Sequence, residues 1–119
     1  MTEWKVGPVL LGTDQGRFVA PGWVNDRFGI DCRYDADGDW ALVVTHLKTG
    51  FIIAALAESL ETTKYFAERI GDLGDWDFDD PAEAKAYGEG VKAARTGLSR
   101  VRPSELVFGG AVDALEAAA

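Results

Sequence analysis

The sequence contains a single cysteine, Cys32, among its 119 residues. An intrachain disulfide needs two cysteines, so no disulfide framework can stabilise this chain. A chain without such crosslinks suits a reducing compartment, and we expect the protein to act in the cytoplasm. The hydrophobic content, 47%, is enough for one core without a structural metal or disulfide. The expected organisation is therefore one domain over residues 1–119.

Long hydrophobic runs are also absent from the sequence. The longest apolar run, residues 51–57, has seven residues, whereas a membrane-spanning helix needs about 20. The N-terminus carries Glu3 and Pro8 and lacks the basic stretch and the apolar run of a signal peptide. We therefore expect no association with a membrane.

Basic residues are fewer than acidic ones. The chain has 12 Lys and Arg against 20 Asp and Glu, which gives a formal net charge of −8. Affinity for nucleic acid comes largely from Lys and Arg that displace counterions from phosphates, so direct nucleic-acid binding is not expected. The acidic excess is local, because residues 71–90 contain seven acids and one base, Lys85. This distribution favours a basic protein surface as the partner.

Alternating apolar and polar residues predict the centre of the fold. Residues 28–34 have the period of a β-strand with one buried face. The acidic segment 35–39 that follows predicts a three-residue hairpin turn, with Gly38 at the position that needs a left-handed backbone. This turn sets a register in which Cys32 lies opposite Leu42. The next strand is therefore expected to return antiparallel to the first.

The same arrangement repeats further along the chain. Residues 48–50 again form a three-residue turn that ends in glycine, so strands 40–47 and 51–56 complete a three-stranded antiparallel meander. Both strands are apolar on both faces, which indicates a position covered on two sides or central in a larger sheet. Upstream, residues 4–11 and 17–20 predict a further hairpin, at the sheet edge because a proline lies within or beside each strand.

The hydrophobic period changes from two to 3.6 near Ser59. Ser59 suits a helix N-cap, and the apolar residues of 60–71 lie on one helical face. A second helix is expected over 81–98, with Asp80 as its cap and a proline in its first turn. The predicted fold class is α+β, with an antiparallel β-meander sheet packed on two α-helices. Residues 110–119 are either a short third helix or a frayed tail.

The chemistry of catalysis is sparse in this sequence. Cys32 and His46 are the only residues of their types, but the predicted register separates them by about 13 Å along the strand direction. A core thiol and a locally hydrogen-bonded histidine near the sheet rim explain both residues. The turn 35–39 departs from a calcium loop, which needs glycine at its sixth position and not its fourth. We expect no metal, no cofactor and no enzymatic activity; the alternative is a small hydrolase or metabolite-binding domain that uses His46.

The segment D75-W76-D77-F78-D79-D80 is the candidate functional site. In extended backbone the two aromatic rings point one way and alternate carboxylates point the other. One interpretation buries both rings, uses Asp79 and Asp80 at the start of the next helix, and leaves the other acids in solvent. The other makes the acids a negative surface for a basic groove, held in place by the buried rings. The candidate partner-binding residues are Asp72, Asp75, Trp76, Asp77, Phe78, Asp79, Asp80 and Glu83.

The segment W40-A41-L42-V43-V44-T45-H46-L47-K48-T49-G50, with the later D75-W76, resembles small uncharacterised proteins encoded by phages and other mobile elements. The resemblance covers residues 40–78. It implies a context in which many small acidic proteins bind and block host enzymes, some by imitating nucleic acid. We therefore expect a non-enzymatic inhibitor of a host protein that handles nucleic acid, of the anti-CRISPR or DNA-mimic type.

Self-association is a further possibility that the charge pattern raises. Lys92, Arg95, Arg100 and Arg102 place positive charge at the far end of the predicted helix whose start is acidic. Two copies of the chain could therefore pair head to tail as a homodimer. The simpler explanation is that acids at a helix start and bases at its end complement the macrodipole within one chain.

Overall fold

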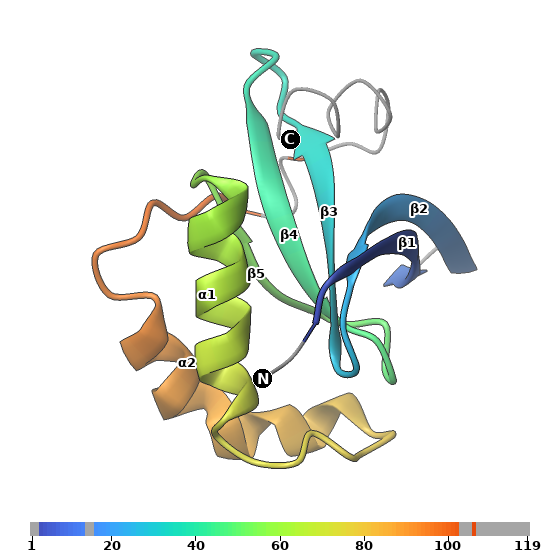
Figure 1. Cartoon of the computed structure of the whole chain (residues 1–119), viewed down its shortest axis with the longest axis vertical. Helices are drawn as coiled ribbons and strands as arrows, with labels where there is room; N and C mark the ends of the chain where they lie inside the picture. Colours follow the sequence, from blue (N-terminus) through green and yellow to red (C-terminus); the bar gives the residue numbers. More distant parts are fainter. Residues whose placement is uncertain (1–2, 14–15, 103–105, 107–119) are drawn as a thin grey trace.

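Five antiparallel strands form one sheet in the computed structural model, which describes residues 3–13, 16–102 and 106. The strands are β1 (Lys5–Thr13), β2 (Gly16–Val24), β3 (Phe28–Tyr34), β4 (Trp40–His46) and β5 (Ile52–Leu56). Their order in the sheet is β1-β2-β3-β4-β5, the same as in the chain. Helix α1 (Leu60–Gly71), the 3-10 helix η1 (Pro81–Tyr87) and helix α2 (Gly88–Ala94) follow (Figure 1). The predicted α+β meander is confirmed.

The predicted register of the central hairpin is also confirmed. Cys32 lies opposite Leu42 in the pairing of β3 with β4, as the alternation of apolar residues requires. Both tight turns carry a glycine with a positive φ, 84° at Gly38 and 76° at Gly50. A side chain at either position would strain the turn, because the left-handed region disfavours a Cβ. Turn chemistry and the buried pattern thus specify the same pairing.

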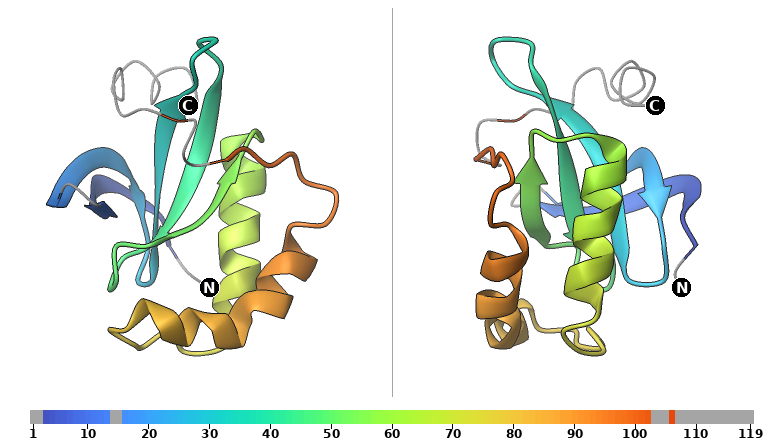
Figure 2. Two further views of the ribbon diagram at one scale, coloured as in Figure 1. Left: turned by 180° about the vertical axis from the view of Figure 1, so that it is seen from behind. Right: turned by 60° about the vertical axis from the view of Figure 1, so that its left-hand side comes forward.

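The helices cover one face of this sheet. Helix α1 packs against β3 and β4, and α2 packs against α1 (Figures 1 and 2). The core between the sheet and the helices contains large buried side chains from every layer. They are Trp23, Phe28, Ile30, Leu42, Val44, Leu56, Phe66, Ile70, Trp76, Phe78 and Val91. Ser59 caps α1 as predicted, since its side chain accepts a hydrogen bond from the Thr62 N–H at 3.2 Å.

The prediction that β3 has only one buried face is wrong. Asp31 and Arg33, on the face away from the helices, are 0% and 4% exposed. Arg33 Nε donates to Asp31 Oδ2 at 2.8 Å, so the two charges enter the interior as an ion pair. Val9 of β1 approaches the same face so closely that a Cβ at Gly29 would lie 2.6 Å from Val9 Cγ1. The β1–β2 hairpin therefore covers part of a face that the sequence pattern assigned to solvent.

The N-terminal hairpin is longer than residues 4–11 and 17–20 predicted. Its two prolines are register partners, Pro8 in β1 and Pro21 in β2. The first lies in the edge strand, and the second lies in the part of β2 that does not pair with β3. Proline has no backbone N–H, and at both positions no hydrogen bond to a neighbouring strand is required from that nitrogen. The expectation of an edge strand is met by β1, whereas β2 lies between β1 and β3 and its proline falls beyond the pairing with β3.

The second predicted helix, residues 81–98, differs most from the structure. Asp80 caps its start as predicted, because its Oδ1 accepts from the Ala82 N–H at 3.0 Å. The first seven residues, however, are a 3-10 helix, and α2 ends at Ala94. A Cβ at Gly90 would lie 2.5 Å from Leu73 Cδ2, so this glycine serves close packing and not an uninterrupted helix. Gly97, with a φ of 85°, turns the chain after α2.

The chain after this turn lies against the free edge of β5. The Val101 N–H donates to the Ala55 carbonyl at 2.9 Å, and the Ala57 N–H donates to the Ser99 carbonyl at 2.7 Å. The expected helix or tail over 110–119 lies outside the described residues. Across the ranges that the structure describes, every helix is too short or too polar to cross a bilayer.

Candidate functional site

Six exposed carboxylates gather in the connection between α1 and α2. We call them the acidic surface: Asp72, Asp75, Asp77, Asp79, Asp80 and Glu83. The chain there comes directly from the end of α1 and runs into η1, so the segment is anchored at both ends by secondary structure. All six side chains face solvent, as both interpretations of the sequence expected.

The two aromatic residues of this segment point into the core. Trp76 is 2% exposed and Phe78 is 8% exposed. Trp76 Nε1 donates to the Ile70 carbonyl at 2.8 Å, and its ring stacks on Tyr87 with centroids 4.4 Å apart. Phe78 packs on the His46 ring at 4.7 Å. The predicted burial of both rings is confirmed, and these side chains can only support a surface that the acids form.

The backbone of the segment is not a simple extended strand. Trp76 has a φ of 55°, in the left-handed region that a large side chain adopts only under strong constraint. Asp75 Oδ1 accepts a hydrogen bond from the Asp77 N–H at 3.1 Å and so closes a small turn around Trp76. The sequence pattern predicted which side chains point inward but contained no signal for this turn.

His46 connects the sheet to this turn. A carbonyl oxygen can only accept, so His46 Nε2–H donates to the Trp76 carbonyl at 2.8 Å. The Thr49 hydroxyl, 2.8 Å from Nδ1, then donates to that nitrogen in the neutral ring. The predicted local hydrogen bond is present, but the ring is not at an open rim, since it is only 1% exposed. His46 thus holds the backbone of Trp76 in place.

The stability of the protein should depend on the charge of His46. Burial lowers the pKa of its imidazole below the ordinary value of about 6.5. As the pH falls below that value the unfolded state binds a proton and the folded state does not, so the free energy of unfolding decreases. We expect a loss of up to about 1.4 kcal/mol per pH unit in this window. Urea titrations between pH 7.5 and 5.5 measure it, and a His46→Gln variant with an identical slope would contradict the assignment.

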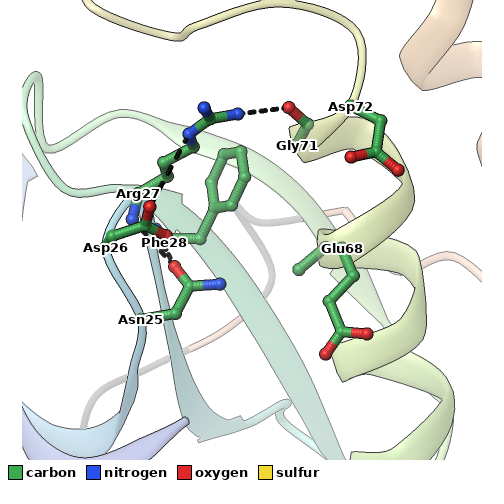
Figure 3. A pocket seen from close by; sticks show the side chains of 8 residues that line it. Asn25, Asp26, Arg27, Phe28, Glu68, Gly71 and Asp72 are labelled. Atoms are coloured by element: carbon green, nitrogen blue, oxygen red, sulfur yellow. Dashed lines mark hydrogen bonds and ion pairs between the residues drawn. The ribbon is translucent and has the colours of Figure 1, made fainter. Parts of the chain in front are cut away.

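Arg27 fixes the other side of the turn. Its Nη1 donates to the carbonyls of Gly71, the last residue of α1, and of Gly74, the latter at 2.9 Å. Figure 3 shows the guanidinium extending from the β2–β3 connection to the end of α1. A cation at a helix C-terminus also complements the helix dipole. Sequence reasoning missed this role, because Arg27 lies 44 residues from Gly71.

Lys48 lies within the acidic surface. Its Nζ forms an ion pair with Asp77 and lies 3.8 Å from Asp79 Oδ1. The hydrogen bond from Lys48 lowers the pKa of the Asp77 carboxyl, so that this acid stays ionised. Asp79 lies near Lys48, whereas Asp80 caps the start of η1, where its carboxylate accepts a hydrogen bond from the Ala82 N–H. The ion pair of Lys48 with Asp77 is exposed, so solvent screens it. A charged group of a partner protein can therefore take the place of Lys48 beside the acid.

Other reactive groups give no second candidate. Burial raises the pKa of the Cys32 thiol to about 11, which makes it a poor nucleophile at neutral pH. Within the described residues, no three His, Cys, Asp or Glu side chains converge to hold a metal ion. The acidic turn at 35–39 is the predicted hairpin, in which the Asp35 N–H donates to the Asp39 carbonyl at 2.8 Å.

Comparison of the chain with protein-family models, with curated proteins and with solved structures finds no match.

Proposed function

We propose that the chain is a non-enzymatic interaction protein whose acidic surface occupies a basic site on another protein. The partner class that fits best is a protein that handles nucleic acid, because such proteins carry concentrated Lys and Arg that normally face phosphates. The chain would then inhibit by imitating the charge of nucleic acid, as an anti-CRISPR protein or another DNA mimic does. The resemblance to proteins of mobile elements favours a host protein as the target.

The observation that carries this proposal is the anchoring of the acidic surface by groups on three sides. Its backbone is held from inside by the Trp76 ring, from the sheet by His46 and from the helix end by Arg27. A charged surface that is already ordered loses little conformational entropy on binding. A merely solvated loop would need none of these three anchors. Three side chains, those of Trp76, His46 and Arg27, hold one exposed acidic turn in place. This arrangement supports a role of the turn in recognition.

The affinity of such a complex should decrease as the salt concentration rises. Charges of opposite sign steer two proteins together, and this attraction weakens as the screening length falls from about 10 Å at 0.1 M salt to about 3 Å at 1 M. Lys48 reduces the charge of Asp77 but also offers a hydrogen-bond donor beside it. The partner therefore meets a surface in which the ammonium of Lys48 lies next to two of the acids, Asp77 and Asp79.

The proposal is tested by affinity purification with a charge-neutralised variant. Asp75, Asp77 and Asp79 are changed to asparagine, which keeps a side-chain oxygen for the bond from the Asp77 N–H. Asp80 is left intact because it caps η1. We expect the variant to fold, and to lose at least about tenfold in affinity for the partners that the unchanged protein recovers at low salt.

The chain provides a matched control for this experiment. Asp35, Asp37 and Asp39 have the same spacing as the three acids of the test variant and also lie in an exposed turn. Their replacement by asparagine removes the same charge at a different place, and we expect it to leave the recovery of partners unchanged. If both triple variants recover the same proteins with the same salt dependence, the acidic surface is not the binding site.

The alternative function, a small hydrolase or metabolite-binding domain that uses His46, is less well supported. A hollow of about 220 Å³ does lie beside this residue, lined also by Asp26, Lys48 and Asp75. Both nitrogens of the ring are hydrogen-bonded to the protein, however, and a general base needs one of them for its substrate. A thermal-shift screen with metabolites, in which a hit is abolished by His46→Gln, would favour this alternative.

A further inference from the structure

A second charged feature, of the opposite sign, lies where the chain leaves α2. A hollow of about 270 Å³ is lined by Lys92, Arg95, Thr96, Gly97, Leu98 and Arg100. Three of these six residues are cationic, in a protein whose formal net charge is −8. An acidic protein offers many carboxylates with which a cation can pair. Three cations that instead gather around one hollow therefore require an explanation.

These three cations are not used by the fold. Within residues 3–13 and 16–102, the ion pairs involve only Arg27, Arg33 and Lys48 among the bases. Arg95 Nε is shielded from solvent and has no hydrogen-bond partner. A buried N–H without an acceptor is costly, and such groups usually mark a missing ligand, ion or water. Arg95 lines the hollow, and the described part of the fold supplies no acceptor for its Nε–H.

Capping of α2 does not account for the cations either. Two carbonyls of the last turn accept backbone hydrogen bonds: Val91 accepts from the Arg95 N–H at 3.1 Å, and Ala93 accepts from the Thr96 N–H at 3.2 Å. The Lys92 carbonyl accepts from the Thr96 hydroxyl at 3.4 Å. The side chains of Lys92, Arg95 and Arg100 are thus not needed as caps. A seven-residue helix also has only a small dipole for them to complement.

We propose that this hollow, which we call the basic pocket, binds the phosphate group of a small molecule. Two guanidinium groups and one ammonium match an oxyanion with two charges, and guanidinium forks suit phosphate geometry in particular. The volume is just below the range of pockets that hold drug-sized ligands, so it suits a phosphate group with little else enclosed. Gly97 lines the hollow beside the cations, with open space where a side chain would lie.

The test is a titration with inorganic phosphate, followed by the backbone amide shifts of Thr96, Gly97 and Leu98. Sodium chloride at the same ionic strength is the reference. We expect saturable shifts with phosphate and none with chloride. Arg95→Gln and Arg100→Gln should each weaken phosphate binding by about tenfold, since each removes a charge-assisted hydrogen bond. Lys85→Gln removes one exposed charge from η1 outside the pocket and should leave binding unchanged.

The same titration with pyrophosphate and ADP identifies the source of the phosphate group. Tighter binding of ADP with the same amides shifted supports a nucleotide, and tightest binding of inorganic phosphate supports the free ion. Shifts that chloride reproduces, or that persist in both arginine variants, overturn the proposal. So does a salt-sensitive dimer in light scattering that phosphate does not dissociate, because the occupant is then the acidic surface of a second copy.

Discussion

Replacement of Trp76 by alanine should remove a large part of the protein's stability. The ring is almost completely buried, stacks on Tyr87 and donates to the Ile70 carbonyl. Truncation of a buried tryptophan typically costs about 3–5 kcal/mol, because the cavity closes only in part. A domain of this size has a total stability of about 5–15 kcal/mol. Urea unfolding followed by circular dichroism measures the loss.

Two further variants separate the contributions to this effect. Trp76→Phe keeps an apolar ring and removes only the indole bond to the Ile70 carbonyl, which still accepts from the Leu73 N–H at 3.1 Å, so we expect about 0.5–1.5 kcal/mol of destabilisation. Tyr65→Ala removes an aromatic ring from the exposed side of α1 and should cost less than about 1 kcal/mol. If Trp76→Ala is as mild as Tyr65→Ala, the ring does not anchor the acidic surface.

Replacement of Arg33 by methionine should also be severe, at about 3–5 kcal/mol near neutral pH. Asp31 is fully buried, and Arg33 supplies two hydrogen bonds to its carboxylate, at 2.8 and 3.3 Å. Without the guanidinium a negative charge would remain in the interior. Burial alone raises the pKa of the Asp31 carboxyl, and Arg33 opposes that rise. The variant should therefore fold with Asp31 protonated.

The loss of unfolding free energy caused by Arg33→Met should depend on pH. A raised pKa in the folded state means that the folded protein holds a proton that the unfolded chain has released. Stability is then lost as the pH rises from about 3.9, the value of the unfolded chain, through the folded value. The difference in unfolding free energy from the unchanged protein should thus be smaller at pH 4.5 than at pH 7.5. A difference independent of pH, or no recovery in Asp31→Asn/Arg33→Met, would refute a charge effect.

The parts of the fold that the sequence predicts are those with local causes. The register of β3 with β4 follows from a turn glycine and from residues that alternate over seven positions. The burial of Trp76 and Phe78 follows from the same alternation, and the Asp80 cap follows from the proline after it. In each case neighbouring residues determine the local backbone, so the pattern could be interpreted without the rest of the chain.

The parts that the sequence did not predict depend on contacts between distant residues. Gly90 lies within the single helix predicted over 81–98, but its missing side chain makes room for Leu73. His46 looked like a residue with a local partner, but its second bond reaches Trp76, 30 residues away. The bases of the basic pocket were interpreted as charges that complement the helix macrodipole, because only the structure shows that three of them surround one hollow. Composition located the acidic surface but not the anchors beneath it.

The identical order of the strands in the chain and in the sheet has a consequence for the kinetics of folding. Every strand pairs with its neighbour in sequence, so the sheet grows through short loops whose closure costs little entropy. The acidic surface is different, because His46 and Arg27 reach it across 30 and 47 residues. We expect its amides to exchange with solvent through a partial opening that leaves the sheet intact. A newly synthesised chain can therefore complete its meander before any surface for a partner exists.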